Sequence, residues 1–143
     1  MTLEHLPARE SGTPGAVIAE ISNTVVRLVR EHFGKGPTQA KTIWSDDVVS
    51  VVMRGGFTTA EKTLYRAGRG DVVDEGRKAM QEVFEREMCS AISRLTGRRV
   101  DAFLSANHHD PDVIVEMFIL AGAEGSVPDG AQVEDLHTGD AAA

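Results

Sequence analysis

The chain has 143 residues, of which 41% are hydrophobic and 26% charged, and its formal net charge is −7. This length allows one domain to bury a core without disulfides or structural metals. The composition is ordinary for a globular protein. Nucleic-acid-binding proteins normally carry a basic surplus, so the acidic balance predicts no nucleic-acid partner.

Cys89 is the only cysteine, so no disulfide can form within the chain, and a reducing cytoplasm is the expected compartment. No window approaches the ~20 apolar residues that span a bilayer. The N-terminus also lacks the apolar segment of a signal peptide. We therefore expect a cytoplasmic protein without direct membrane insertion, which would reach the inner membrane only through a partner.

The first predicted element is an amphipathic helix. Residues 1–12 show no hydrophobic periodicity and are predicted to form a flexible leader. Thr13 as N-cap and Pro14 at the first helical position then indicate a helix start. An apolar stripe with three- and four-residue steps continues to about Phe33. Its members are Val17, Ile18, Ile21, Val25, Leu28 and Val29.

A hairpin and a short helix come next. Residues 40–45 and 48–53 have the composition of two strands, with Asp46-Asp47 as the turn between them. Gly55-Gly56 ends the second strand. Thr58 and Glu61 have the spacing of a capping box, in which each side chain satisfies a backbone donor near the other residue. A short helix to about Ala67 is therefore predicted.

The second half of the chain predicts a long helix and a second hairpin. The helix runs from Asp71 to a stop at Gly97 and, at ~1.5 Å per residue, is about 40 Å long. A strand over 100–106, a turn over 107–112 and a very apolar strand over 113–120 follow. The apolar residues expected to face inward from the helix are Val72, Val73, Met80, Val83, Phe84, Met88, Ala91, Ile92 and Leu95.

The order α-ββ-αα-ββ predicts an α+β fold: a two-layer sandwich with a four-stranded antiparallel sheet and the helices on one face. We expect a single domain over residues 13–121. Residues 122–143 hold five acidic residues and no lysine or arginine, and they are predicted to form a disordered acidic tail. The open edges of a valine-rich sheet also predict a homodimer, although edge pairing is only one route to it.

The segment GKGPT at 34–38 has the composition of a phosphate-binding loop but not its order. A Walker loop needs Lys-Ser/Thr after its last glycine, and it leads from a strand into a helix. Here the lysine precedes the second glycine, and the segment leads from a helix into a strand. We interpret Gly34 as a helix stop, with Pro37 preventing continuation.

The junction after the second strand is the better candidate for an anion or small-ligand site. It leads from a strand through glycines into a helix N-terminus, where backbone N–H groups favour anions. The alternative is an ordinary strand-to-helix turn with solvated basic residues. The candidate residues are Arg54, Gly55, Gly56, Thr58, Lys62, Arg66 and Arg69.

His108, His109 and Asp110 are the candidate metal ligands. Adjacent histidines in an extended segment point apart, so a closed site would need His32, His137 or a partner chain. The alternative is a polar hairpin turn.

We expect neither a catalytic residue set nor a cofactor. Cys89 is interpreted as an inert thiol at the edge of the core, and Trp44 as an interface anchor or a cap on the core.

The stretch MRGGFTTAEKTLYRAGRGDVVDEGRK at 53–78 is the most distinctive part of the chain. Together with FGKGP at 33–37, Thr96-Gly97 and the closing hairpin VDAFLSANHHDPDVIVEMFIL, it resembles the MpsC family of bacterial membrane-potential-generating systems. The resemblance covers about residues 15–120 and includes Arg77 within the long helix. It implies a small soluble component of membrane systems that move cations, and a link to inorganic-carbon uptake. It implies no catalytic residues.

Three functions remain open. The first is a non-enzymatic accessory or regulatory protein acting with a membrane transporter subunit for cations or inorganic carbon. The second is an anion or ligand sensor using the junction at 54–69. The third is a metal-dependent enzyme at the turn 108–112.

Overall fold

The structure is a computed structural model, and it describes residues 14–122. The predicted leader, the Thr13 cap and most of the predicted acidic tail lie outside the described residues. Within the described part, α2 (Pro14–Phe33) leads into the strands β1 (Gln39–Ser45) and β2 (Val48–Arg54). Helices α3 (Thr59–Arg66) and α4 (Gly70–Thr96) follow, and strands β3 (Val100–His108) and β4 (Val113–Leu120) close the fold.

The four strands form one antiparallel sheet in the order β1-β2-β4-β3. The two hairpins therefore join through β2 and β4, where Val51 lies opposite Glu116 and Val52 opposite Val115. Strands β1 and β3 form the two edges. Between Val100 and Ala102 the pairing of β3 with β4 is irregular.

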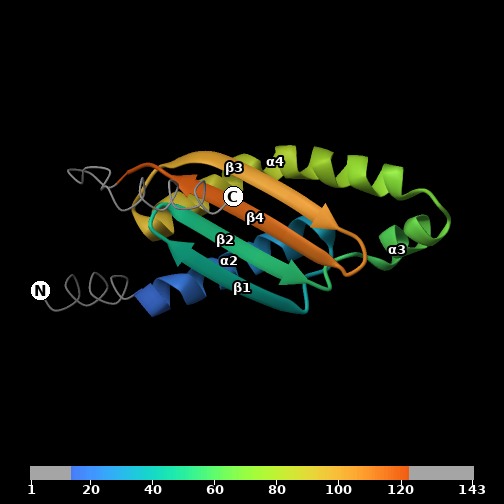
Figure 1. The fold of residues 1–143 in the computed structure, drawn as a ribbon, viewed down its shortest axis with the longest axis horizontal. Helices are drawn as coiled ribbons and strands as arrows, with labels where there is room; N and C mark the ends of the chain where they lie inside the picture. Colours follow the sequence, from blue (N-terminus) through green and yellow to red (C-terminus); the bar gives the residue numbers. More distant parts are fainter. Residues whose placement is uncertain (1–13, 123–143) are drawn as a thin grey trace, which may run out of the picture.

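Helices α2 and α4 lie side by side across one face of the sheet (Figure 1). Helix α3 extends beyond the end of the sheet, at the corner where the chain leaves β2 (Figure 1). The core forms between the two layers, because one stripe of each helix faces alternate residues of the central strands. Ile21, Val51, Met88 and Phe118 are among its fully buried residues. The predicted α+β two-layer sandwich is confirmed.

The stop signals act as the sequence predicts. Gly34 has φ +79° and its N–H donates to the Arg30 carbonyl, which closes α2. Gly97 has φ +75° and ends α4 in the same left-handed conformation. Thr58 and Glu61 form the capping box of α3. Trp44 packs against the core, and its Nε1 donates to the Asp46 carbonyl. This agrees with its interpretation as a cap on the core.

Two details differ from the prediction. Strand β3 continues to His108 instead of ending at 106, so the turn is shorter. The inward stripe of α4 is also different: Val72 is 40% and Val83 73% exposed, whereas Arg77 and Gln81 are buried. The buried positions of α4 follow the helical spacing from Val73 to Phe84, and this spacing places Arg77 and Gln81 inside.

Candidate functional site

Many of the residues that carry the family resemblance, those of FGKGP and of 53–78, converge on one corner of the molecule, where β2 passes into α3, whereas Thr96-Gly97 lies at the far end of α4. This corner, called the Arg77 junction below, brings together the end of α2, the 34–38 loop, the start of α3, α4 and the β3–β4 turn. Its centre is Arg77, which is 1% exposed. It is therefore a buried charge, and such a charge must be paired.

Arg77 is satisfied on every side of its guanidinium. Its Nε donates to Glu61 Oε2 at 2.9 Å and its Nη2 donates to Glu61 Oε1 at 2.7 Å, a two-pronged ion pair. Nη2 also donates to the Gly56 carbonyl at 3.1 Å. The rings of Phe33 and Phe57 stack on the guanidinium carbon, at 4.4 and 4.3 Å from their centroids. These contacts tie α4 to α2, α3 and the end of β2.

Glu61 serves two structural purposes at once. Its Oε1 accepts from the Thr58 backbone N–H at 2.9 Å, completing the capping box, while both oxygens bind Arg77. Burial alone raises the pKa of this carboxyl. The hydrogen bonds from Arg77 and Thr58 outweigh burial and hold the pKa below its ordinary value. Glu61 is therefore ionised at neutral pH.

The loop after α2 supports the same corner. Lys35 Nζ donates to the Gly55 carbonyl at 2.6 Å. Gly55 has φ +74°, and a Cβ there would lie 2.3 Å from Thr38 Oγ1, so the close approach of the two loops requires glycine. The FGKGP segment thus acts as a helix stop whose lysine anchors the strand-to-helix junction.

The backbone donors expected to bind an anion are already in use. The Asp112 carboxylate accepts from the Gly56 N–H at 3.3 Å and from the Phe57 N–H at 3.1 Å. The Thr58 N–H is bound by Glu61. The protein thus supplies its own anions at this helix start, which leaves the basic side chains as the donors for a ligand.

Only some of the predicted anion-binding side chains come together. A cleft of about 470 Å³ is lined by Lys62 and Arg66, together with Gly55, Phe57, Asp110 and Asp112. His109 lines it as well and stacks on Tyr65 with 3.6 Å between ring centroids. Arg54 and Arg69 are not among its lining residues, and Arg69 pairs with Asp71 instead. An anion site here stays a prediction, now centred on Lys62 and Arg66.

The two predicted histidine ligands are engaged separately, and Asp110 lines the same cleft as His109. His108 Nδ1 lies 2.9 Å from the Pro111 carbonyl, while His109 stacks on Tyr65. Within residues 14–122 no three histidine, cysteine or acidic side chains are grouped to hold a metal ion. His32 contacts Glu87 at 3.0 Å, and His137 lies outside the described residues. A metal site at His108, His109 and Asp110 therefore stays a prediction.

The core holds a second ionisable residue, Glu116 of β4, which is 1% exposed. Burial raises its pKa to about 7, against the opposing effects of Ser105 and Arg77. Neither Glu116 Oε1 nor the Ser105 hydroxyl has a hydrogen-bond partner in the described structure. Unlike Arg77, this group is only weakly compensated, because burial has a larger effect on its pKa than Ser105 and Arg77 together.

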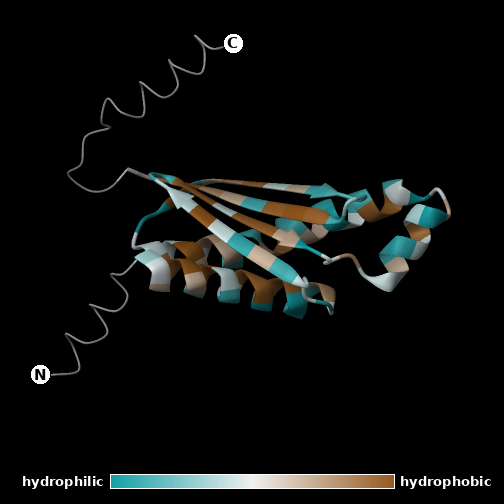
Figure 2. Ribbon diagram, turned by 60° about the horizontal axis from the view of Figure 1, so that its bottom comes forward, coloured by the Kyte–Doolittle hydropathy of each residue, from teal (hydrophilic) through white to brown (hydrophobic). Residues whose placement is uncertain are grey.

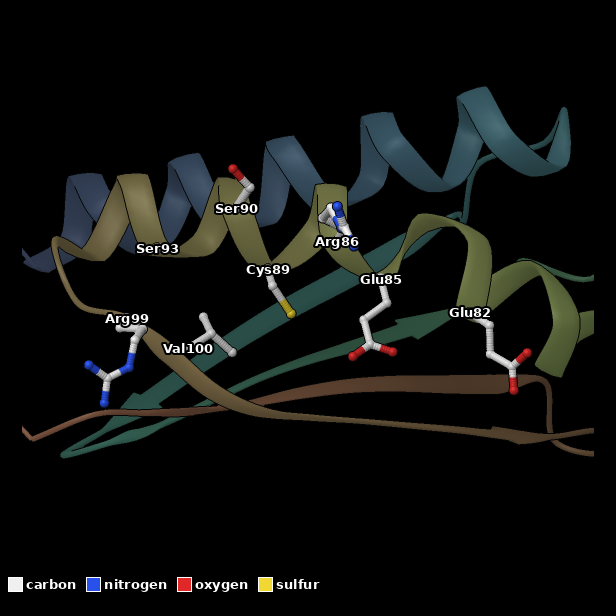
Figure 3. A pocket seen from close by; sticks show the side chains of 8 residues that line it. All are labelled: Glu82, Glu85, Arg86, Cys89, Ser90, Ser93, Arg99 and Val100. Carbon is white, nitrogen blue, oxygen red and sulfur yellow. The ribbon is translucent and has the colours of Figure 1, made fainter.

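Cys89 lies in a groove between α4 and β3, with its side chain directed toward the strand (Figure 3). Burial raises the pKa of its thiol, and the charge of Glu85 acts in the same direction. A thiol with a raised pKa is a poor nucleophile, which agrees with the inert interpretation. The groove has a volume of about 540 Å³ and is lined by Glu82, Glu85, Arg86, Cys89, Ser90, Ser93, Arg99 and Val100.

The sequence analysis missed three of these roles. The burial of Arg77 and of Glu116 could have been found from side-chain position, because Arg77 lies one turn after Val73 and Glu116 alternates with Ile114 and Phe118. The role of Asp112 had no local signal, since it depends on a contact more than fifty residues away in the chain.

The fold and the junction define a small two-layer α+β protein whose distinctive charged residues hold its own elements together. The family model described as "Na+-translocating membrane potential-generating system (MpsC)" matches residues 13–122. The chain belongs to the MpsC family. It is also 21% identical over 105 residues to a Bacillus subtilis (strain 168) protein described as "Uncharacterized protein YrhF". That match covers 72% of this chain and 86% of the relative. No solved structure gives a significant match.

No helix within residues 14–122 is long and apolar enough to cross a bilayer.

Proposed function

We propose that this chain is a non-catalytic accessory or regulatory component of a membrane system that translocates cations or inorganic carbon. This proposal rests on the family match, which spans the whole described fold and refers to a Na+-translocating, membrane-potential-generating system. We place the chain in the cytoplasm, held at the inner membrane by a transporter subunit.

The Arg77 junction supports a binding role over a catalytic one. Arg77, Glu61 and Asp112 are the charged residues closest to its centre, and each is used in contacts between elements. A general acid, a general base or a nucleophile must instead reach a substrate with a free atom. The side chains left to face a partner are those on the cleft, Lys62 and Arg66 among them.

The test is co-purification from native membranes. The tagged full chain, recovered after mild detergent extraction, is expected to bring with it a large membrane subunit of an ion-translocating system. Deleting the gene is expected to lower growth at high sodium or at low inorganic carbon. A tagged chain that recovers no membrane protein, together with a deletion strain that grows normally under both conditions, would contradict the proposal.

A second candidate function is favoured by the convergence of Lys62, Arg66 and His109 on one cleft. We propose it as a site for a small anion such as bicarbonate or phosphate. Calorimetry with bicarbonate, phosphate and nucleotides tests it, with Lys62→Ala and Arg66→Ala expected to abolish binding. Arg54→Ala is the matched control, because Arg54 is exposed but does not line the cleft. Equal binding by all three variants would argue against the cleft.

A further inference from the structure

The sheet has two apolar faces, and only one of them is covered. Buried Val49, Val51 and Met53 of β2 face the helices, and the residues between them face the other side. Helices α2 and α4 lie on one side of the sheet, and no described element covers the other side (Figure 2). An antiparallel sheet with one face in water normally has polar residues on that face.

The uncovered face instead carries a continuous apolar band from β2 to β3, with Lys41 of β1 and Ser50 of β2 as polar positions beside it. The register places Val52 beside Val115 and Met117 beside Leu104, so apolar side chains adjoin from strand to strand. Ile43 and Leu104 are 47% and 54% exposed at its two sides. We call this surface the open sheet face; its main apolar residues are Ile43, Val52, Leu104, Val115, Met117 and Ile119.

The open sheet face approaches the size of a specific interface. Four strands spaced ~4.8 Å apart, with a rise of ~3.3 Å per residue over their length, cover roughly 400–500 Å² in projection. This area lies within the roughly 300–600 Å² of the largest patch on a typical monomer, and such patches are often functional. Two such faces together approach the roughly 1,200 Å² at which specific protein interfaces begin, since accessible area exceeds projected area.

Charge along the β1–β2 hairpin is self-complementary, while Arg98 and Asp112 at the same two ends are held by backbone groups of their own chain. Lys41 and Arg54 are exposed near the end of the sheet that adjoins α3. Asp46 and Asp47 form the β1–β2 turn at the opposite end. A two-fold axis lying between two sheets, perpendicular to their strands, reverses one copy's strands relative to the other's. Each basic end then lies over the acidic turn of the other copy, so the occupant that fits both area and charge is a second copy.

We propose that two copies of this chain pack through their open sheet faces, with strands reversed, to form a four-layer dimer with the helices outside. The two sheets would pack about 10 Å apart, as in a β-sandwich. This differs from the edge pairing considered from the sequence. It leaves the Lys62–Arg66 cleft, which is lined from α3 and the turns, free for a partner.

Sedimentation of the full chain tests the dimer. At roughly 50 µM the mass is expected to be twice the 15.4 kDa of one chain. Leu104→Lys and Ile43→Lys are each expected to raise the dimer dissociation constant at least about tenfold, because a two-fold interface contains each new charge twice. Val83→Lys is the matched control: Val83 is equally apolar and 73% exposed, but it lies on α4. Circular dichroism and thermal melts check that every variant is folded.

The orientation has its own test. Arg54→Glu is expected to weaken the dimer, and combining it with Asp47→Lys is expected to restore it. A double variant as weak as Arg54→Glu alone would overturn the reversed orientation. A monomeric wild-type chain would overturn the dimer and leave the face to residues 123–143 or to another protein. A dimer that survives both Leu104→Lys and Ile43→Lys would place the contact elsewhere, for example at the β1 or β3 edge.

Discussion

Two buried ionisable residues of this protein show opposite solutions to the same problem. Arg77 is 1% exposed but fully paired, with a two-pronged carboxylate, a carbonyl and two aromatic rings. Glu116 is equally buried and leaves one oxygen without a partner. A charge in a low-dielectric interior is tolerated when its partners replace water, and a carboxyl without such partners keeps its proton to higher pH.

Arg77→Ala is expected to destabilise the fold by roughly 3–5 kcal/mol, because it leaves the part-buried Glu61 carboxylate without its counter-charge. Urea unfolding measures the change. Arg69→Ala is the matched control: its pair with Asp71 is exposed, so the loss should stay below about 1 kcal/mol. A loss from Arg77→Ala no larger than that of the control would contradict the central role of this residue.

Glu116 is expected to make stability fall as pH rises. Its folded pKa, raised to about 7, lies above its ordinary value of 4.5, so the folded state binds the proton more tightly than the unfolded state. The contribution of the protonated Glu116 carboxyl to the stability of the fold is fully present below pH 4.5 and is lost as pH rises through 7. Glu116→Gln should therefore gain up to about 3 kcal/mol relative to wild type at pH 8 and little at pH 4.5.

Urea unfolding at several pH values between these limits measures that difference. Glu82→Gln, at an exposed position on α4, serves as the control and should leave the pH dependence unchanged. If Glu116→Gln retained the wild-type slope, the fall in stability would originate in other groups.

At the scale of elements, the glycines divide into those that shape junctions and one that only weakens a helix. Gly55 combines a positive φ with a close approach to Thr38, so it fixes how the loop after α2 meets the end of β2. Gly76 lies inside α4, and apart from its chain neighbours and the nearby helix backbone no atom lies within 4 Å of the position its Cβ would take. The same residue type is therefore required at one place and costly at the other.

Gly55→Ala is expected to lower stability by at least about 2 kcal/mol, from the left-handed backbone and the contact with Thr38 Oγ1. Gly76→Ala is expected to raise it by about 0.5–1 kcal/mol, because alanine restricts the unfolded chain and favours the helix. Thermal melts of both variants at one protein concentration test the pair. Melting temperatures that shift in the same direction in the two variants would contradict the different roles assigned to Gly55 and Gly76.

At the scale of the whole molecule, the helices divide the sheet into a covered and an uncovered face. All three described helices lie on one side of the sheet or beyond its end, so no described element buries the second face (Figure 1, Figure 2). The cost of exposed apolar area scales with that area, which makes association the expected response. The Arg77 junction lies at one end of this arrangement.

The proposed dimer gives a thermal prediction. The melting temperature of the wild-type chain is expected to rise by several degrees over about a hundredfold increase in protein concentration, because association stabilises the folded state by mass action. Leu104→Lys should melt at a temperature that does not depend on concentration, whereas Val83→Lys should behave as wild type. A wild-type melting temperature that stays constant over this range would contradict association.

The sequence determined the elements and their layers, because those depend on local patterns. The stripe from Val17 to Val29, the capping box at Thr58 and the stops at Gly34 and Gly97 are each contained within a few turns or a short segment of chain. Two hairpins and three helices then left the α+β two-layer sandwich as the expected arrangement. The family resemblance indicated a class of function, whereas no local sequence motif indicated a catalysed reaction.

Only the tertiary structure decided what the charged residues do. Whether Arg54, Lys62, Arg66 and Arg69 converge depends on the path of the chain after β2, and just two of them reach the cleft. Asp112 fills the backbone donors of Gly56 and Phe57 from more than fifty residues away, and Arg77 finds its partners on other elements. Local periodicity shows which side of an element a residue occupies, but the partner it meets there is set by long-range packing.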